Sequence, residues 1–297
     1  MSVKRTWKQV DGVLLLDKSE GMTSNAALQK ARRLFSAAKG GHTGTLDPMA
    51  TGLLPLCFGE ATKFSADLLE ADKTYEARVL LGSCTDTGDR EGQVMRTAPV
   101  SCTETDVLAM LPRFTGTILQ VPPMYSALKR EGRPLHELAR QGVEVERQAR
   151  PVTLHALELL ACDLPLLRLR VRCSKGTYIR VLAEDLGQAL GCGAHLVALR
   201  RTQVGPLRLE GAVTLAELES LEENQRLSRL RPVDSLLSTL PAIQVDPAGE
   251  ARFSHGNPVQ PPAGLQGVAR VYVEQRLLGV GEVKDDGKLW PRRLIAQ

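Results

Sequence analysis

One carboxylate and one imidazole lie within a stretch rich in glycine and proline, GHTGTLDPMATGLLP, which runs from Gly41 to Pro55. The carboxylate is Asp47, and such a group can act as a nucleophile or as a general base. The imidazole is His42. Because glycine permits positive φ and proline fixes φ, the stretch predicts a shaped loop that presents Asp47 to a substrate. The alternative is an Asp-Pro pair that only starts a turn, and the residue types alone favour it.

Two tyrosines and two cations offer further chemistry outside this loop. Tyr75 stands at the start of an expected strand, where its ring can line a cleft or pack in the core with a satisfied hydroxyl. Tyr178 and Arg180 fall where a strand ends and a helix opens, and Arg180 is poorly explained there as a surface residue. Lys18 follows the first expected strand. A solvated strand end is its ordinary interpretation, and contact with a substrate is the alternative.

The apolar pattern positions these residues on strands and helices that follow one another along the chain. Period-two alternation predicts a half-buried strand over residues 74–81, with Tyr75 on its apolar face. The polar run TDTGDREG, residues 85–92, predicts a hairpin loop and lacks the ligand pattern of a calcium loop. Further strands are expected at 10–16, 165–173 and 199–209, and helices at 24–35, 60–69, 103–111, 180–190 and 214–230.

Positive charge gathers in two parts of the chain. Residues 129–150 are dense in charge, which is typical of a solvated face and also suits a mobile arm that closes over a polyanion. Residues 165–173 alternate apolar side chains with Arg168, Arg170 and Arg172, so three guanidinium groups share one face. That face can meet phosphate or water. The net charge of +4 is compatible with a polyanionic partner but does not require one.

Composition bounds the class of protein. The 297 residues are 43% hydrophobic and 24% charged, which is ordinary for a soluble globular protein and leaves room for two domains. The six cysteines have no metal-knuckle spacing, and no stretch resembles a signal peptide or a membrane span. We therefore expect a reduced, cytoplasmic protein with no metal site and no membrane contact. After the proline-containing segment 231–241, short strands and turns predict a small barrel.

Read together, several stretches resemble the TruB family of tRNA pseudouridine synthases, and the resemblance covers nearly the whole chain. The strongest pieces, in this specific order, are GHTGTLDPMATGLLPLCFGEATK (41–63), KTYEA (73–77), TDTGDREG (85–92), PPMYSALKREG (122–132) and CSKGTYIR (173–180). The segment LLGVGEVKDDGKLWPRRL (277–294) resembles the small PUA-type RNA-binding barrel of bacterial members. Two departures stand out. Ser19 replaces the proline of the usual DKPxGxTS motif, and His136 stands where the family often has tyrosine.

The resemblance implies a role for each candidate residue. It makes Asp47 the catalytic aspartate with Arg180 beside it. It places Tyr75 against an everted uracil, with Tyr178 and Leu199 lining the base pocket. His42 is implied to contact or help displace the target nucleotide, and Lys18 is kept among the substrate-binding residues.

The resemblance also implies an α+β fold, with a mixed, mostly antiparallel sheet flanked by helices. Residues 1–235 would form the catalytic domain, with an RNA-contacting arm at about 124–150, and residues 242–297 a PUA-like barrel. The implied reaction isomerises uridine 55 in the T-loop of tRNA. It is redox-neutral, so no cofactor is expected, and no protein partner is implied for what we expect to be a monomer. The alternative is an RNA-binding or RNA-folding protein without essential catalysis.

Overall fold

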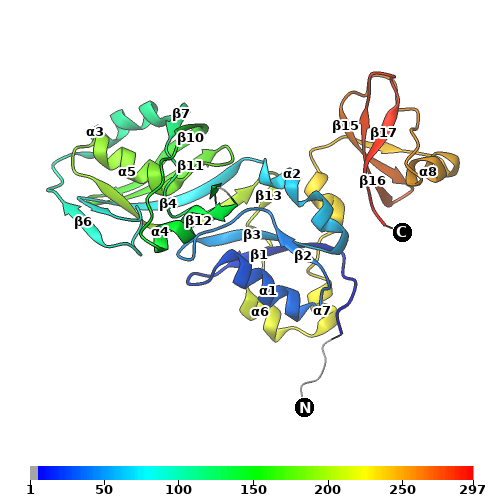
Figure 1. Ribbon diagram of the computed structural model, residues 1–297, viewed down its shortest axis with the longest axis horizontal. Helices are drawn as coiled ribbons and strands as arrows, with labels where there is room; N and C mark the ends of the chain where they lie inside the picture. The colour runs from blue at the N-terminus through cyan, green and yellow to red at the C-terminus, as the bar shows by residue number, and fades with distance from the viewer. Residues whose placement is uncertain (1–5, 127, 131, 297) are drawn as a thin grey trace, which may run out of the picture.

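The computed structural model of the protein describes residues 6–126, 128–130 and 132–296, and its largest element is a mixed β-sheet (Figure 1). Within these residues the sheet has nine strands in the order β1-β3-β12-β4-β11-β10-β7, with β2 beside β3 and β13 beside β12. Neighbouring strands are antiparallel except β3 and β12. The strands are β1 (Gly12–Lys18), β2 (Gly40–His42), β3 (Thr51–Phe58), β4 (Lys73–Leu81), β7 (Gly116–Gln120), β10 (Arg150–Asp163), β11 (Leu166–Cys173), β12 (Ala194–Val204) and β13 (Leu207–Arg208).

Side-chain alternation explains how the central strands face. In β11 the apolar residues Leu167, Leu169 and Val171 are buried, whereas the arginines between them are exposed, as expected from the sequence. Strand β1 does not alternate in this way, because the four consecutive apolar residues 13–16 are all buried. Leu14 and Leu16 belong to the core beneath the helices, and Val13 and Leu15 to a second core on the opposite face. The α+β architecture with a largely antiparallel mixed sheet is therefore confirmed.

Helices cover the sheet and complete the main core. Helices α1, α3, α5 and α6 contribute buried apolar residues to the same cluster as the sheet, and α5 packs against β12. Helix α1 starts where Thr23 Oγ1 accepts a hydrogen bond from the Ala26 amide. The helices of this region are α1 (Ser24–Leu34), α2 (Ser65–Leu69), α3 (Glu104–Met110), α4 (Leu135–Arg140), α5 (Ile179–Ala189), α6 (Leu215–Ser220) and α7 (Glu223–Leu227), with 3₁₀ turns η1 (Gly59–Phe64), η2 (Leu111–Phe114) and η3 (Val233–Leu237).

Four segments differ in detail from expectation. The strand expected at 199–209 starts earlier, as β12, and turns back as β13. The glycine-rich loop is shorter than predicted, because strands β2 and β3 take its two ends and leave only residues 43–50 irregular. The helix expected at 60–69 is a 3₁₀ turn followed by α2. The helix expected at 214–230 is two helices, because Leu221 is extended and Glu222 starts α7 with a capping box. Residues 85–92 form the expected hairpin loop between β5 (Ser83–Thr85) and β6 (Val94–Thr97).

A second, separate sheet occupies the C-terminal end of the chain, coloured orange to red in Figure 1. Its strands pair in the order β14-β15-β16-β17 around a core of its own, and helix α8 packs against it. Among residues 242–296 these pairings describe an open four-stranded sheet, whereas the sequence pattern predicted a barrel. The elements are β14 (Ala242–Gln244), α8 (Pro247–Ser254), β15 (Val268–Val273), β16 (Arg276–Val283) and β17 (Leu289–Leu294).

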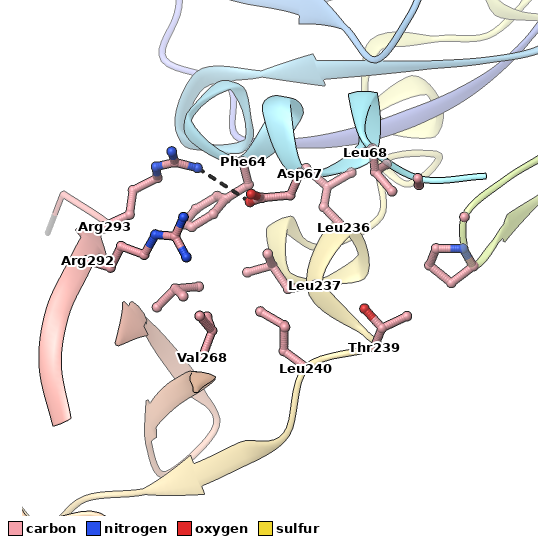
Figure 2. Close-up of a pocket in the computed structure, with 14 residues that line it drawn as sticks. Phe64, Asp67, Leu68, Leu236, Leu237, Thr239, Leu240, Val268, Arg292 and Arg293 are labelled. Carbon is pink, nitrogen blue, oxygen red and sulfur yellow. Dashed lines mark hydrogen bonds and ion pairs between the residues drawn. The ribbon is translucent and has the colours of Figure 1, made fainter. Parts of the chain in front are cut away.

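The two sheets meet across a partly open junction. A pocket of about 320 Å³ lies there. Its lining residues come from η1, α2, the η3 segment and the C-terminal sheet (Figure 2). Arg293 pairs with Asp67 across it at 3.4 Å and lies over the ring of Phe64. Lys63 donates a hydrogen bond to the Leu294 carbonyl. These contacts tie the C-terminal sheet to the segment that follows β3.

None of the helices in the described ranges combines the length and apolar character needed to cross a membrane.

Candidate active site

Asp47 and Arg180 lie side by side, as the sequence analysis expected. Asp47 is in the irregular loop between β2 and β3, and Arg180 is in the first turn of α5. The Arg180 Nε atom is 3.0 Å from Asp47 Oδ2, and the side chains of Asp47 and Arg180 are 36% and 5% exposed, respectively. The cation is therefore buried, whereas its carboxylate partner keeps one side open to solvent. A substrate can reach Asp47 without displacing Arg180.

Arg180 is held by more groups than Asp47 alone. Its Nε is also 3.5 Å from the Oδ2 of Asp89, whose side chain is only 6% exposed. Its Nη1 donates to the Thr87 carbonyl at 3.0 Å, and its Nη2 donates to the Tyr125 carbonyl at 2.7 Å. The guanidinium thus joins the Asp47 loop to the 85–92 hairpin loop and to the start of the arm. Sequence analysis missed Asp89, because it treated residues 85–92 as a structural loop.

The main chain on both sides of Asp47 is fixed by buried polar groups. Ser24, at the start of α1, donates from its hydroxyl to the Leu46 carbonyl at 3.1 Å and accepts from the Leu46 amide at 2.8 Å. The Pro48 carbonyl accepts from Lys18 Nζ at 3.2 Å. The residues before and after Asp47 therefore have little freedom, which pre-orients its carboxylate.

The expectation of a solvated Lys18 is wrong. Lys18 has no exposed surface, because its ammonium lies under the turn that follows β1. Its Nζ donates to the carbonyls of Ser19 at 3.0 Å and Met22 at 2.8 Å, in addition to the bond to Pro48. All three ammonium protons thus have acceptors. The geometry places Lys18 behind the loop, as a support for the backbone next to Asp47, rather than at a surface that a substrate can touch.

Charge in the site is unevenly balanced. Burial raises the pKa of Asp47 above its ordinary value of 3.8 and the Asp89 charge adds to the rise, while Arg180 and Lys18 oppose it. Burial, together with the charges of Asp89 and Asp47, also raises the pKa of Glu91. Burial lowers the pKa of Lys18 to about 8. The site therefore favours the protonated forms of Asp47 and Glu91 more than water does, and Arg180 and Lys18 limit that tendency at Asp47.

Tyr75 and His42 lie near a second buried arginine. Tyr75, on β4, is directly opposite Arg201 of β12 in the strand register. Burial raises the pKa of Tyr75, and the charge and hydrogen bond of Arg201 oppose the rise. His42 ends β2, and burial followed by the Arg201 charge lowers its pKa, which favours the neutral ring. Its Nδ1 is buried and has no hydrogen-bond partner within the described ranges.

The remaining predicted pocket residues occupy two different positions. Tyr178 caps α5, and its amide and carbonyl both hydrogen-bond the buried side chain of Gln120. Leu199 is 8% exposed on β12 and lines a pocket of about 490 Å³ together with Met49 and Thr51. Asp47, Tyr75 and Tyr178 are not in the lining of that pocket. The structure thus brings Asp47 and Arg180 into direct contact, whereas Leu199 lines a pocket that none of Asp47, Tyr75 and Tyr178 lines.

The basic surfaces are partly neutralised. On β11, Arg168 pairs with Glu76 at 3.1 Å, and Arg170 pairs with Glu76 and Glu158 at 3.5 and 3.3 Å. The arm contains the small hairpin β8 (Lys129–Arg130) and β9 (Arg133–Pro134), followed by α4. Ala127 and Glu131 of the predicted arm, and the side chain of His136, lie outside the part of the chain that the structure describes. Among the described residues there is no group of three or more His, Cys, Asp or Glu side chains that could hold a metal ion.

Family models match almost the whole chain. The model described as "TruB family pseudouridylate synthase (N terminal domain)" matches residues 32–179. Residues 180–238 match "tRNA pseudouridylate synthase B C-terminal domain", and residues 241–295 match "Pseudouridine synthase II TruB, C-terminal". These matches include the Asp47 loop, the start of α5 and the C-terminal sheet.

Curated relatives and a solved structure agree with those matches. The tRNA pseudouridine synthase B of Dechloromonas aromatica is 68% identical over 295 residues, which cover 99% of each chain. The enzyme of the same name from Aromatoleum aromaticum is 58% identical and covers 97% of this chain and 93% of that one. A chain in the crystal structure of the archaeal box H/ACA sRNP Nop10-Cbf5 complex is 25% identical with a TM-score of 0.72, covering 96% of this chain and 86% of that chain.

Proposed function

Because the chain belongs to the TruB family of pseudouridine synthases, we propose that it converts uridine 55 in the T-loop of tRNA into pseudouridine. The observation that carries this proposal for the site itself is the 3.0 Å contact between Asp47 and Arg180, with Asp47 open on one side. The relatives named above are tRNA pseudouridine synthases over their full length, which supports tRNA as the substrate class.

The reaction requires one bond to break and another to form at the same sugar carbon. The N1–C1′ bond is cleaved, the uracil turns within the pocket, and a C5–C1′ bond forms. The proton on C5 is then released to solvent, and N1 gains a proton. Asp47 attacks C1′ as a nucleophile or acts as a base on the ribose, and both roles need its carboxylate charged. Arg180 favours that charged form and fixes the carboxylate orientation.

The uridine must leave its stacked position before it can reach Asp47. Everting a base costs a few kcal/mol, and stacking on an aromatic ring returns about 1–3 kcal/mol. We assign that ring to Tyr75. Tyr178 and Leu199 bound the space for the base, and His42, whose neutral form is favoured, contacts the nucleotide that is displaced. Lys18 supports the loop from behind and does not touch the RNA.

Recognition of the folded RNA is expected to depend on shape and phosphate charge outside the base pocket. We propose that the arm, about residues 124–150, and the arginine face of β11 make these contacts. Since Arg168 and Arg170 already bind Glu76 and Glu158, phosphate binding there requires exchange of these ion pairs. Affinity should therefore fall as the salt concentration rises.

We further propose how the chain is organised around this activity. Residues 1–235 form the catalytic domain, and residues 242–297 form a PUA-like domain that adds RNA contacts. The enzyme works as a monomer in the cytoplasm and uses no cofactor, because the isomerisation needs no external electron or atom donor. The core around the large sheet and the core within the C-terminal sheet support the division into domains, and a third cluster joins the two domains, because it contains Val280 of β16 together with residues of β1 and β3.

A tritium-release assay tests the proposal. A tRNA transcript carrying tritium at C5 of uridine should lose label to solvent when C5–C1′ bond formation displaces that hydrogen. We expect Asp47→Asn to bind tRNA with little change and to release no tritium. Asp285→Asn is the matched control, because Asp285 is an exposed aspartate in the turn between β16 and β17, away from Arg180, and this variant should release tritium as wild type does.

Three outcomes would contradict the assignment in different ways. Binding without tritium release by the wild type would favour an RNA-binding protein without catalysis. Full activity of Asp47→Asn would remove Asp47 from the mechanism. Equal release from unrelated uridine-containing hairpins would contradict the T-loop as the substrate.

A further inference from the structure

Arg201 is a buried charge that the mechanism above does not use. It lies on β12, is 1% exposed, and is the largest side chain of the described core with so little exposure. No Asp or Glu of the described residues lies within ion-pair distance of its guanidinium, unlike Arg180 and Arg200, which each contact an aspartate. Burying an uncompensated charge is costly, and an apolar side chain of similar size would fill the same space at lower cost.

The guanidinium of Arg201 donates to three main-chain carbonyls, which lie in the loop that contains Asp47 and in β3, the strand that follows this loop. Its Nη2 donates to the Gly44 carbonyl at 3.2 Å, and its Nη1 to the Thr45 carbonyl at 3.5 Å. Its Nε donates to the Leu53 carbonyl at 2.8 Å. Gly44 and Thr45 precede Asp47 and Leu53 follows it. One planar guanidinium therefore joins the two ends of the loop, which short polar side chains could not span.

The same guanidinium also faces the base-binding side of the site. Arg201 and Tyr75 are directly opposite each other in the β12–β4 register, so their side chains lie on the same face of the sheet, and the Arg201 charge opposes the burial that raises the pKa of Tyr75. The main chain of Arg201 also packs closely against the start of β3, because a Cβ atom on Gly52 would lie 2.3 Å from the Arg201 carbonyl oxygen.

We propose that Arg201 is a positioning residue that fixes the distance between the Asp47 carboxylate and the Tyr75 ring. The inference rests on the proposed function, in which these two groups hold the sugar and the base of one uridine. Because both groups must fit the same nucleotide, an error of about 1 Å between them would lower the rate by as much as 100-fold. Arg201 itself does not touch the RNA, so tRNA affinity should change little.

Steady-state kinetics of tritium release on Arg201→Met and Arg201→Lys test this role. We expect kcat to fall about 100-fold for Arg201→Met and about tenfold for Arg201→Lys, which keeps the charge but cannot reach all three carbonyls. The dissociation constant for tRNA should stay within about threefold. Arg226→Met is the matched control, because Arg226 also donates to two main-chain carbonyls, those of Leu221 and Leu34, but far from the site.

The outcomes separate a positioning role from a structural one. Loss of kcat with retained tRNA affinity, and a smaller loss for Arg201→Lys, would support the proposal. A wild-type kcat in Arg201→Met would overturn the proposal. It would also be overturned if Arg201→Met lost kcat and tRNA affinity together and to the same extent as Arg226→Met. If Arg201→Met does not fold, Arg201→Lys decides, and its full activity would overturn the proposal. An inactive wild type would contradict the proposed function as well. If the wild type is active, a failed prediction counts against the role of Arg201 alone.

Discussion

Replacing Arg180 by methionine should destabilise the protein in a way that depends on pH. The guanidinium is 4% exposed and contacts Asp47, Asp89 and the carbonyls of Thr87 and Tyr125. Methionine fills part of the volume but satisfies none of these acceptors. The buried carboxylate of Asp89 would lose its cation, and two carbonyls would lose their donor.

The size of the effect follows from burial. Removing one partner of a buried ion pair costs about 3–5 kcal/mol, because the other charge stays buried and unpaired. The Asp47 side chain is 36% exposed, so solvent screens the interaction between Asp47 and Arg180. We therefore expect a cost at the lower end of this range, about 3 kcal/mol. Arg200→Met is the matched control. Arg200 pairs with Asp17 at 2.6 Å, but its side chain is 41% exposed, so its loss should cost about 1 kcal/mol or less.

The pH dependence has a definite sign. The pKa of Asp47 is already above 3.8 in the folded protein, and loss of Arg180 removes the strongest effect that lowers it. A carboxyl whose folded-state pKa exceeds its unfolded value keeps the folded state stable at low pH and loses that stability as pH rises through the folded pKa. The extra cost of Arg180→Met should therefore be full at neutral pH and shrink as pH approaches 3.8.

Urea unfolding followed by circular dichroism at neutral and mildly acidic pH measures both quantities. The free energy of unfolding of each variant is compared with that of wild type at the same pH. Two results would refute the reasoning: equal costs for Arg180→Met and Arg200→Met at neutral pH, or a cost of Arg180→Met that grows as the pH falls.

Two further predictions concern the packing around the Asp47 loop and the core. Gly52→Ala should lower the free energy of unfolding by about 1–3 kcal/mol, because Gly52 has φ of +97° and its new methyl would meet the Arg201 carbonyl. The control Gly41→Ala has no atom near the new methyl and should unfold in urea like wild type. Equal urea midpoints for the two variants would contradict this prediction. Burial raises the pKa of Cys57 and Cys173 to about 12, so neither thiol should react with iodoacetamide in the native protein at neutral pH. Mass spectrometry of native and urea-treated protein measures the labelling and compares it with that of the less buried thiols of Cys84, Cys102 and Cys162. Rapid labelling of Cys57 or Cys173 in the native protein would contradict the prediction.

The elements that carry the site could be predicted from local pattern. Alternation of leucine and arginine over 165–173 predicted the two faces of β11. The helix expected at 103–111 is α3, which Thr103 and Asp106 cap at its start. The boundary at Tyr178 was also correct, because the change from strand to helix is visible in the spacing of apolar residues. Helix breaks were less visible, since the extended Leu221 has no glycine or proline to mark it.

The sequence by itself determined the family of the chain and predicted which residues form its site. The order of the motifs identified Asp47 and its partner Arg180 before any geometry was known, and their 3.0 Å contact agrees with that assignment. Tertiary structure alone decided which polar groups surround them. Lys18 reads as a surface residue, and Asp89 and Arg201 read as parts of a loop and a strand, until segments far apart in the chain are packed together. Burial and hydrogen-bond partners depend on those long-range contacts. The charges that shift the pKa of Asp47 depend on them too, because Lys18 of β1 and Arg180 of α5 lower it while Asp89 of the 85–92 loop raises it.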